Sequence, residues 1–134
     1  MTTVESPTER NRAIIQAMYD AGRRGDVETL ASFIADDVVV DEPRFLPYGK
    51  IYKGKQELLQ LFQTVAKFLD VSQLQVHYLI ADGERVAACL GLPDLTTGQP
   101  VSLLEESTLK DGKITHQKLF FNDPGSMLDK PKVV

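Results

Sequence analysis

The sequence has few of the features that mark secreted, membrane-spanning or nucleic-acid-binding proteins. Its single cysteine, Cys89, cannot form an internal disulfide, which fits a reducing compartment. No apolar run approaches the ~20 residues of a membrane span, and the first residues contain no apolar signal core. Lys and Arg total 15 against 19 Asp and Glu, and the net charge of −4 disfavours a nucleic-acid partner. We therefore expect a cytoplasmic protein with no membrane and no nucleic-acid partner.

Several motifs of catalysis are missing as well. The chain has no phosphate-cradling glycine loop, no nucleophile elbow and no cysteine pair at metal-ligand spacing. The two histidines, His77 and His116, are far apart in the sequence and have no third ligand nearby, so we expect no metal site. These absences leave proton transfer without a cofactor, or binding alone.

The length and composition indicate one globular domain. A chain of 134 residues can bury a single hydrophobic core, and nothing in it is repeated or of low complexity. We expect one domain over residues 1–134, with its core in about 7–122. The tail 123–134 has two prolines and mixed charge, and we expect it to pack loosely.

The first half of the chain has the pattern of three helices. Ser6 and Pro7, followed by Glu9, are typical of a helix start. Apolar residues at helical spacing follow, and Gly25 is placed to end this helix in a left-handed cap. A short second helix comes next, and a third, longer one begins after Gly54.

Strand patterns fill the rest. One apolar strand lies between the second and third helices, and four alternating segments follow the third: Val38–Val40, then Leu74–Ala81, Arg85–Leu92, Val101–Lys110 and Lys113–Phe121. The Asp-Gly pair between the last two predicts a two-residue hairpin turn. The order α-α-β-α-β-β-β-β predicts an α+β fold, with three helices on one side of a curved antiparallel sheet and an apolar pocket between the layers.

The most informative stretch is 36–54, where two carboxylates follow an apolar strand. Glu42 shares a strand face with Val38 and Val40, whereas Asp41 lies on the opposite face. If the first face looks inward, Glu42 is a carboxylate in an apolar wall, with a pKa raised toward that of a useful general base. The alternative is a strand-end carboxylate in solvent or paired with Arg44.

A second carboxylate candidate lies in the third strand of the meander. Glu105 alternates with Leu103 and Ser107, whereas the face of Glu106 ends in a threonine and a lysine. Glu105 is thus the better candidate for the pocket, where it and Glu42 could form an acid/base pair with one member protonated. The alternative is that both glutamates pair with lysines across the sheet or across a dimer.

Aromatic residues and a histidine complete the candidate site. Tyr48 and Tyr52 flank a glycine in a loop that could close the pocket, where their hydroxyls could donate to a carbonyl or phenolate ligand; alternatively they pack the loop onto the third helix. Phe62 and Phe121 suit the pocket wall or the core. The alternation around His116 does not settle which face it occupies.

The order of elements, together with short motifs, resembles the nuclear transport factor 2-like superfamily, in its SnoaL-like and ketosteroid-isomerase-like branch. The resemblance runs from about Asn11 to Asn122 and is carried by five segments: Gly25–Glu28, Ala35–Val38, Glu42–Pro43, Tyr52–Gly54, and the Asp-Gly-Lys-Ile hairpin with Phe120–Phe121. It implies a cone-shaped sheet around an apolar pocket, and a homodimer. The branch includes isomerases, polyketide cyclases, dehydratases, epoxide hydrolases and non-catalytic binding or assembly modules, so the fold does not fix the function.

The resemblance also implies roles for single residues. Ketosteroid isomerases have their catalytic carboxylate at the position of Glu42, and a neutral carboxylic acid that stabilises the oxyanion at the position of Glu105. Their tyrosine donor falls at Met18, a candidate ligand contact here, with Tyr19 about 100° further round the helix. Epoxide hydrolases would need an arginine that only Arg85 could supply. Dehydratases would need two histidines with tyrosines.

We therefore expect a cofactor-free isomerase, cyclase or dehydratase that acts on a small apolar carbonyl compound. Glu42 would be the base, and Glu105 with Tyr48 or Tyr52 would stabilise the oxyanion. Further ligand contacts are predicted at Asp41, Phe62, His116, Phe121 and Met18. The alternatives are a non-catalytic binder of small ligands and a homodimerising assembly module.

Overall fold

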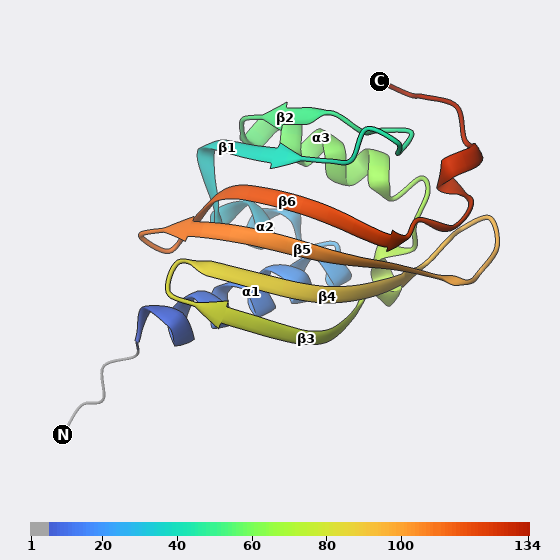
Figure 1. The fold of residues 1–134 in the computed structure, drawn as a ribbon. Coiled ribbons are helices and arrows are strands. Elements are labelled where there is room, and N and C mark those ends of the chain that lie inside the picture. The colour runs from blue at the N-terminus through green and yellow to red at the C-terminus, as the bar shows by residue number, and fades with distance from the viewer. Residues whose placement is uncertain (1–5) are drawn as a thin grey trace.

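A computed structural model describes residues 6–134, and residues 1–5 of the predicted domain lie outside the described residues. Three helices and six strands follow one another along the chain (Figure 1). The helices are α1 (Pro7–Arg24), α2 (Val27–Ser32) and α3 (Lys55–Val65). The strands are β1 (Ile34–Asp41), β2 (Ile51–Lys53), β3 (Gln75–Asp82), β4 (Arg85–Pro93), β5 (Pro100–Lys110) and β6 (Lys113–Asp123), with short 3₁₀ helices η1 (Val71–Gln73) and η2 (Gly125–Asp129). No helix in residues 6–134 is long and apolar enough to cross a membrane.

The strands form one curved sheet in the order β2-β1-β6-β5-β4-β3, with the three helices on one of its faces (Figure 1). Strands β3 to β6 are the expected antiparallel meander. β1 pairs with β6 in parallel and with β2 in the antiparallel sense. The predicted α+β fold is confirmed; the three-residue β2 was not predicted, because its sequence lies within the aromatic loop.

Local signals explain where α1 begins and ends. The Ser6 side chain accepts a hydrogen bond from the backbone N–H of Glu9 at 3.2 Å, as a helix cap does. The helix ends at Gly25, whose φ of 73° is in the left-handed region that glycine tolerates best. Between these caps Ile15 and Met18 are buried against the sheet side, at helical spacing.

The β5–β6 hairpin sets which residues of these strands face the helices. Asp111 and Gly112 both have positive φ, as a type I′ turn requires. Just beyond the turn the register shifts by one residue: Leu109 pairs with Ile114, but Thr108 pairs with His116, so Thr115 is an extra residue. This bulge places Ile114 and Gln117 inside and His116 outside, because it interrupts the alternation of faces.

The C-terminal segment is held more firmly than the sequence indicated. Met127 in η2 is 1% exposed, and the N–H of Val133 donates to the carbonyl of Pro47 at 2.9 Å. Lys132 Nζ contacts the carbonyls of Arg44 and Leu46, the latter at 2.7 Å. The expectation of a loose tail is corrected, because one buried methionine and these polar contacts attach residues 124–134 to the loop after β1.

Candidate active site

Glu42 follows β1 directly and points into the interior. Its neighbours on the same face, Val38 and Val40, are 0% and 1% exposed, and Glu42 itself is 2% exposed. The carboxyl oxygen Oε1 is buried and has no hydrogen-bond partner. Burial raises the pKa of Glu42 from its ordinary value of 4.5 to about 8, and the charges of Glu105 and Asp41 add to the effect. Glu42 is therefore a carboxyl group enclosed by apolar residues.

Glu105 enters the same interior from the middle of β5, on the face covered by α1. Its Oε1 accepts hydrogen bonds from the Tyr19 hydroxyl at 2.7 Å and from Gln117 Nε2 at 3.0 Å. Burial raises the pKa of Glu105 from 4.5 to about 7, although the bond from Tyr19 acts to lower it. The adjacent Glu106 is on the outer face, where it pairs with Arg85 at 3.5 Å. The structure thus brings two glutamates with raised pKa values into one interior.

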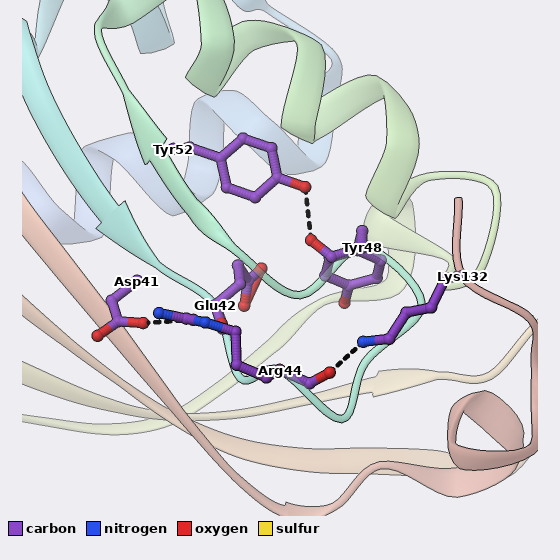
Figure 2. A network of polar contacts seen from close by, with 6 residues as sticks. All are labelled: Asp41, Glu42, Arg44, Tyr48, Tyr52 and Lys132. Atoms are coloured by element: carbon purple, nitrogen blue, oxygen red, sulfur yellow. Dashed lines mark hydrogen bonds and ion pairs between the residues drawn. The ribbon is translucent and has the colours of Figure 1, made fainter. Parts of the chain in front are cut away.

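Tyr48 and Tyr52 lie beside Glu42 (Figure 2). The Tyr52 hydroxyl donates to the backbone carbonyl of Tyr48 at 2.5 Å, and the Tyr48 hydroxyl contacts the sulfur of Met127 at 3.7 Å. Burial raises the pKa of both tyrosines, and the charge of Glu42 raises it further. Both hydroxyls therefore stay protonated donors, and the one on Tyr48, which has only a thioether partner, is the one more readily redirected to a ligand.

The loop between β1 and β2 closes over Glu42. It folds into two tight turns, in which the N–H of Leu46 donates to Pro43 and the N–H of Gly49 donates to Leu46. A side chain at Gly49 would have its Cβ 1.9 Å from the carbonyl oxygen of Pro43, so only glycine fits this turn. In this compact loop the side chains of Leu46 and Tyr48 are 0% and 1% exposed.

Two hollows within residues 6–134 are at other places than the two glutamates. These two hollows lie on the surface: one of about 530 Å³ between α1, η1 and β3, and one of about 510 Å³ beside the start of α3. Neither includes Glu42 or Glu105 among its lining residues. Leu46, Tyr48 and Met127 are 0%, 1% and 1% exposed, and the Tyr48 hydroxyl contacts the Met127 sulfur, so the loop after β1 and the tail are packed against each other.

Two predicted ligand contacts are wrong in position. Asp41 is on the outer side of β1, where it pairs with Arg44 at 2.9 Å. His116 is exposed on the outer face of β6, where its Nδ1 is 3.1 Å from the Thr115 hydroxyl. Asp41 is excluded by the alternation of its strand, and His116 by the bulge that precedes it.

The other three predicted contacts are inside. Met18 is 3% exposed, and its sulfur is 3.7 Å from Gln117 Nε2, so it borders the Glu105 cluster. Phe62 and Phe121 pack against the core, and Phe121 also meets Phe45 edge to face with ring centres 6.4 Å apart. These two phenylalanines are wall and core residues.

Tyr19 and Gln117 are the residues of the site that sequence reasoning did not include. Tyr19 is one position off the expected donor, yet it is the helix residue that reaches Glu105. Gln117 bonds to Glu105 and also approaches the Ser107 hydroxyl at 3.3 Å. The available signal was a set of polar residues on the inner faces of two apolar strands, Glu105 and Ser107 in β5 and Gln117 in β6. The bulge at Thr115 conceals that Gln117 is on this face.

Within residues 6–134 no three His, Cys, Asp or Glu side chains converge in a way that would hold a metal ion. The chemistry that the site itself offers is proton transfer. Glu42 and Glu105 both have pKa values near neutrality, and in an apolar interior one ionised and one protonated carboxyl group can act as base and acid.

A curved sheet that holds the carboxyl groups of Glu42 and Glu105 on the face covered by three helices is the architecture of a small α+β cone protein. Residues 15–117 match the family model described as a SnoaL-like domain, and the chain belongs to that family. No curated protein matches the sequence.

Solved structures with the same fold include proteins with different names. A candidate ketosteroid isomerase from Kribbella flavida is 22% identical, with 96% of this chain and 93% of that chain covered and a TM-score of 0.75. A candidate polyketide cyclase from Sinorhizobium meliloti is 22% identical, with 81% and 94% covered and a TM-score of 0.69. An NTF2-like protein of unknown function from Burkholderia xenovorans is 21% identical, with 87% and 86% covered and a TM-score of 0.72. At these identities the likeness establishes the fold alone.

Proposed function

We propose that the protein is a cofactor-independent acid/base enzyme, of isomerase, cyclase or dehydratase type, that acts on a small apolar carbonyl compound. The observation that carries the proposal is that buried Glu42 and half-buried Glu105 lie on the inner side of the sheet, both with pKa values raised toward neutrality. A carboxylate there can remove a proton next to a carbonyl, and a neutral donor can stabilise the enolate oxygen that results. The apolar walls favour a ligand with few polar groups.

The proposal can be tested without knowing the natural substrate. In D₂O, a general base exchanges the protons next to the carbonyl of a small ketone for deuterium, and proton NMR follows this loss. We propose 2-tetralone and cyclohex-2-enone as probes, because both are small, largely apolar and carry acidic C–H bonds. The protein should accelerate exchange over buffer, and Glu42→Gln and Glu105→Gln should each lower the rate by about 100-fold or more.

The matched control is Glu106→Gln, which changes the neighbouring glutamate on the outer face of the same strand. It should retain the wild-type exchange rate. Exchange no faster than in buffer for both probes, or equal rates in wild type and both interior variants, would contradict the enzyme proposal.

A second candidate is a homodimerising assembly module. It is favoured by large apolar side chains on the outer face of the sheet: Tyr78, Ile80 and Phe120 are 50%, 61% and 44% exposed. Through the pairing Tyr78–Cys89–Leu104–Phe120, an apolar row crosses four strands. An enzymatic role and a dimer are compatible, because the apolar row is on the outer face of the sheet and Glu42 and Glu105 are on the inner face.

A further inference from the structure

The two interior glutamates differ in the hydrogen bonds that reach their carboxyl groups. Glu105 Oε1 accepts one bond from Tyr19 and one from Gln117, at 2.7 and 3.0 Å. Glu42 Oε1 is buried and accepts none. Donors directed at a carboxyl oxygen stabilise its ionised form, whereas a buried carboxylate without donors is strongly disfavoured relative to the neutral acid. The environment therefore distinguishes the two groups.

Charged neighbours do not reverse this difference. Arg44 is two residues from Glu42, and its guanidinium bonds to the Asp41 carboxylate and to the backbone carbonyl of Glu42, not to the Glu42 carboxyl group. The charges of Glu105 and Asp41 raise the pKa of Glu42, and the hydrogen bond from Tyr19 lowers the pKa of Glu105. The charge of Glu42 in turn raises the pKa of Tyr48 and Tyr52. Every charge assigned to Glu42 is negative, so ionised Glu105 makes Glu42 hold its proton more firmly.

Tyr19 is suited to remain a donor throughout. Burial raises its pKa well above the ordinary value, and the charge of Glu105 and the hydrogen bond to it raise it further. Gln117 cannot ionise, and its amide is held by the Ser107 hydroxyl and the Met18 sulfur as well as by Glu105. Both donors are thus fixed in place by the packing of α1 on the sheet.

We infer that Glu105 is the general base and Glu42 the neutral acid of the pair, with Tyr19 and Gln117 as the positioning residues that keep Glu105 ionised. This deepens the proposed function and rests on it, and it reverses the roles implied by the resemblance to ketosteroid isomerases. In the step, the Glu105 carboxylate takes a proton from the carbon next to the carbonyl. The C–H electron pair forms the enolate, whose oxygen accepts a hydrogen bond from the Glu42 carboxyl. Return of the proton to another carbon leaves both glutamates as they began.

The order in which the two carboxyl groups ionise tests this assignment without any substrate. Carbon-13 NMR of the protein labelled at the glutamate carboxyl carbons follows each titration, and the resonances lost in Glu42→Gln and Glu105→Gln identify the two groups. Glu105 should ionise at the lower pH. Because interacting groups titrate as a pair, the variants also give each group's behaviour without its partner: the pKa of Glu42 should fall when Glu105 is replaced.

Removing a hydrogen-bond donor should change the pKa of Glu105 selectively. Tyr19→Phe deletes one hydroxyl and should raise the pKa of Glu105 by about one unit; Gln117→Leu gives an independent second test in the same direction. The matched control is Tyr78→Phe, which removes a hydroxyl on the outer face and should move neither group.

The outcomes separate this inference from the proposed function. If Glu42 ionises first, or if neither donor variant shifts Glu105, the assignment is overturned even when ketone exchange is catalysed. If Glu105 ionises first and shifts as expected but no exchange occurs, the hydrogen-bond account of the pair stands, while the enzyme proposal and the base role of Glu105 fall together.

Discussion

Two carboxyl groups on the inner side of the sheet make the stability of this protein depend on pH. Glu42 and Glu105 have pKa values of about 8 and about 7 in the fold, against 4.5 ordinarily. Above pH 4.5 the unfolded chain releases these protons while the folded chain retains them, so rising pH favours unfolding. Their contribution to stability is fully present below about pH 4.5 and is lost as the pH rises through 7 and 8. In the pH range where a group is ionised only in the unfolded chain, that group lowers the free energy of unfolding by about 1.4 kcal/mol per pH unit.

Glu42→Gln removes one of these two groups and should flatten the fall in the free energy of unfolding between pH 4.5 and 8. Urea denaturation at a series of pH values measures this slope. Glu106→Gln, on the outer face, should leave it as in the wild type. The burial account of Glu42 is contradicted if Glu42→Gln keeps the wild-type slope.

The residues of the site differ in how far the sequence could predict them. Glu42 and Glu105 were predictable, because each shares a strand face with apolar neighbours and alternation alone gives the side. Tyr19 was not, because one helix position corresponds to about 100° and the rotation of α1 against the sheet depends on tertiary packing. The faces of Gln117 and His116 could not be predicted, because a one-residue bulge, invisible in a two-residue pattern, precedes them.

At the level of elements, one aspartate connects the C-terminal segment to the sheet. Asp94, 1% exposed, accepts bonds at 2.7 Å from both the N–H and the hydroxyl of Ser126, and one at 2.8 Å from the N–H of Thr96. Burial alone would raise the pKa of Asp94, but these hydrogen bonds outweigh it and lower the pKa. Its contribution to stability is therefore present at neutral pH and lost as the pH falls through its folded pKa.

Asp94→Ala should release η2, and with it the contact of Met127 with Tyr48. We expect a loss of about 3 kcal/mol in the free energy of unfolding, because several buried donors lose their partner. Hydrogen exchange at residues 125–129 and in the loop 44–48 should become faster. Asp70→Ala is the matched control, since Asp70 similarly accepts bonds from residues of the short helix η1. If the tail keeps its protection in Asp94→Ala, Asp94 is not its anchor.

Most elements of the fold were predictable and the exceptions have local causes. Helix caps and the Asp-Gly turn gave the ends of α1 and the β5–β6 hairpin, because these signals act within a few residues. The apolar spacing of α3 extended to Leu69, but the helix ends at Val65 and Leu69 instead forms an isolated bridge with Asp94. The attachment of the tail depends on partners more than 30 residues away, which no local pattern specifies.

For the whole molecule, the outer face of the sheet predicts association between two copies. An exposed apolar row through Tyr78 and Phe120 lies beside the Arg85–Glu106 pair, so the face combines apolar area with both charges. Two such faces related by a two-fold axis would cover the row on both copies. We expect a homodimer of twice the 14.9 kDa chain mass.

Sedimentation of the wild type and of Phe120→Glu measures this association. The charge in the middle of the row should weaken the dimer by 10-fold or more, because an unpaired carboxylate loses its hydration there. The control is Leu95→Glu, which changes an apolar residue that is 53% exposed in the loop after β4, and it should sediment as the wild type does. A monomeric wild type, or a Phe120→Glu dimer of unchanged affinity, would rule out this interface.

The central claim is that a small carbonyl compound enters the interior between the sheet and the helices and meets both glutamates. A crystal structure of the protein grown with saturating 2-tetralone tests it most directly. We predict ligand density inside the cone, with the carbonyl oxygen within hydrogen-bonding distance of the Glu42 carboxyl and the adjacent carbon facing Glu105. Ligand found only in the surface hollows beside α1 or α3, or an interior still filled by Leu46, Tyr48 and Met127, would contradict the account.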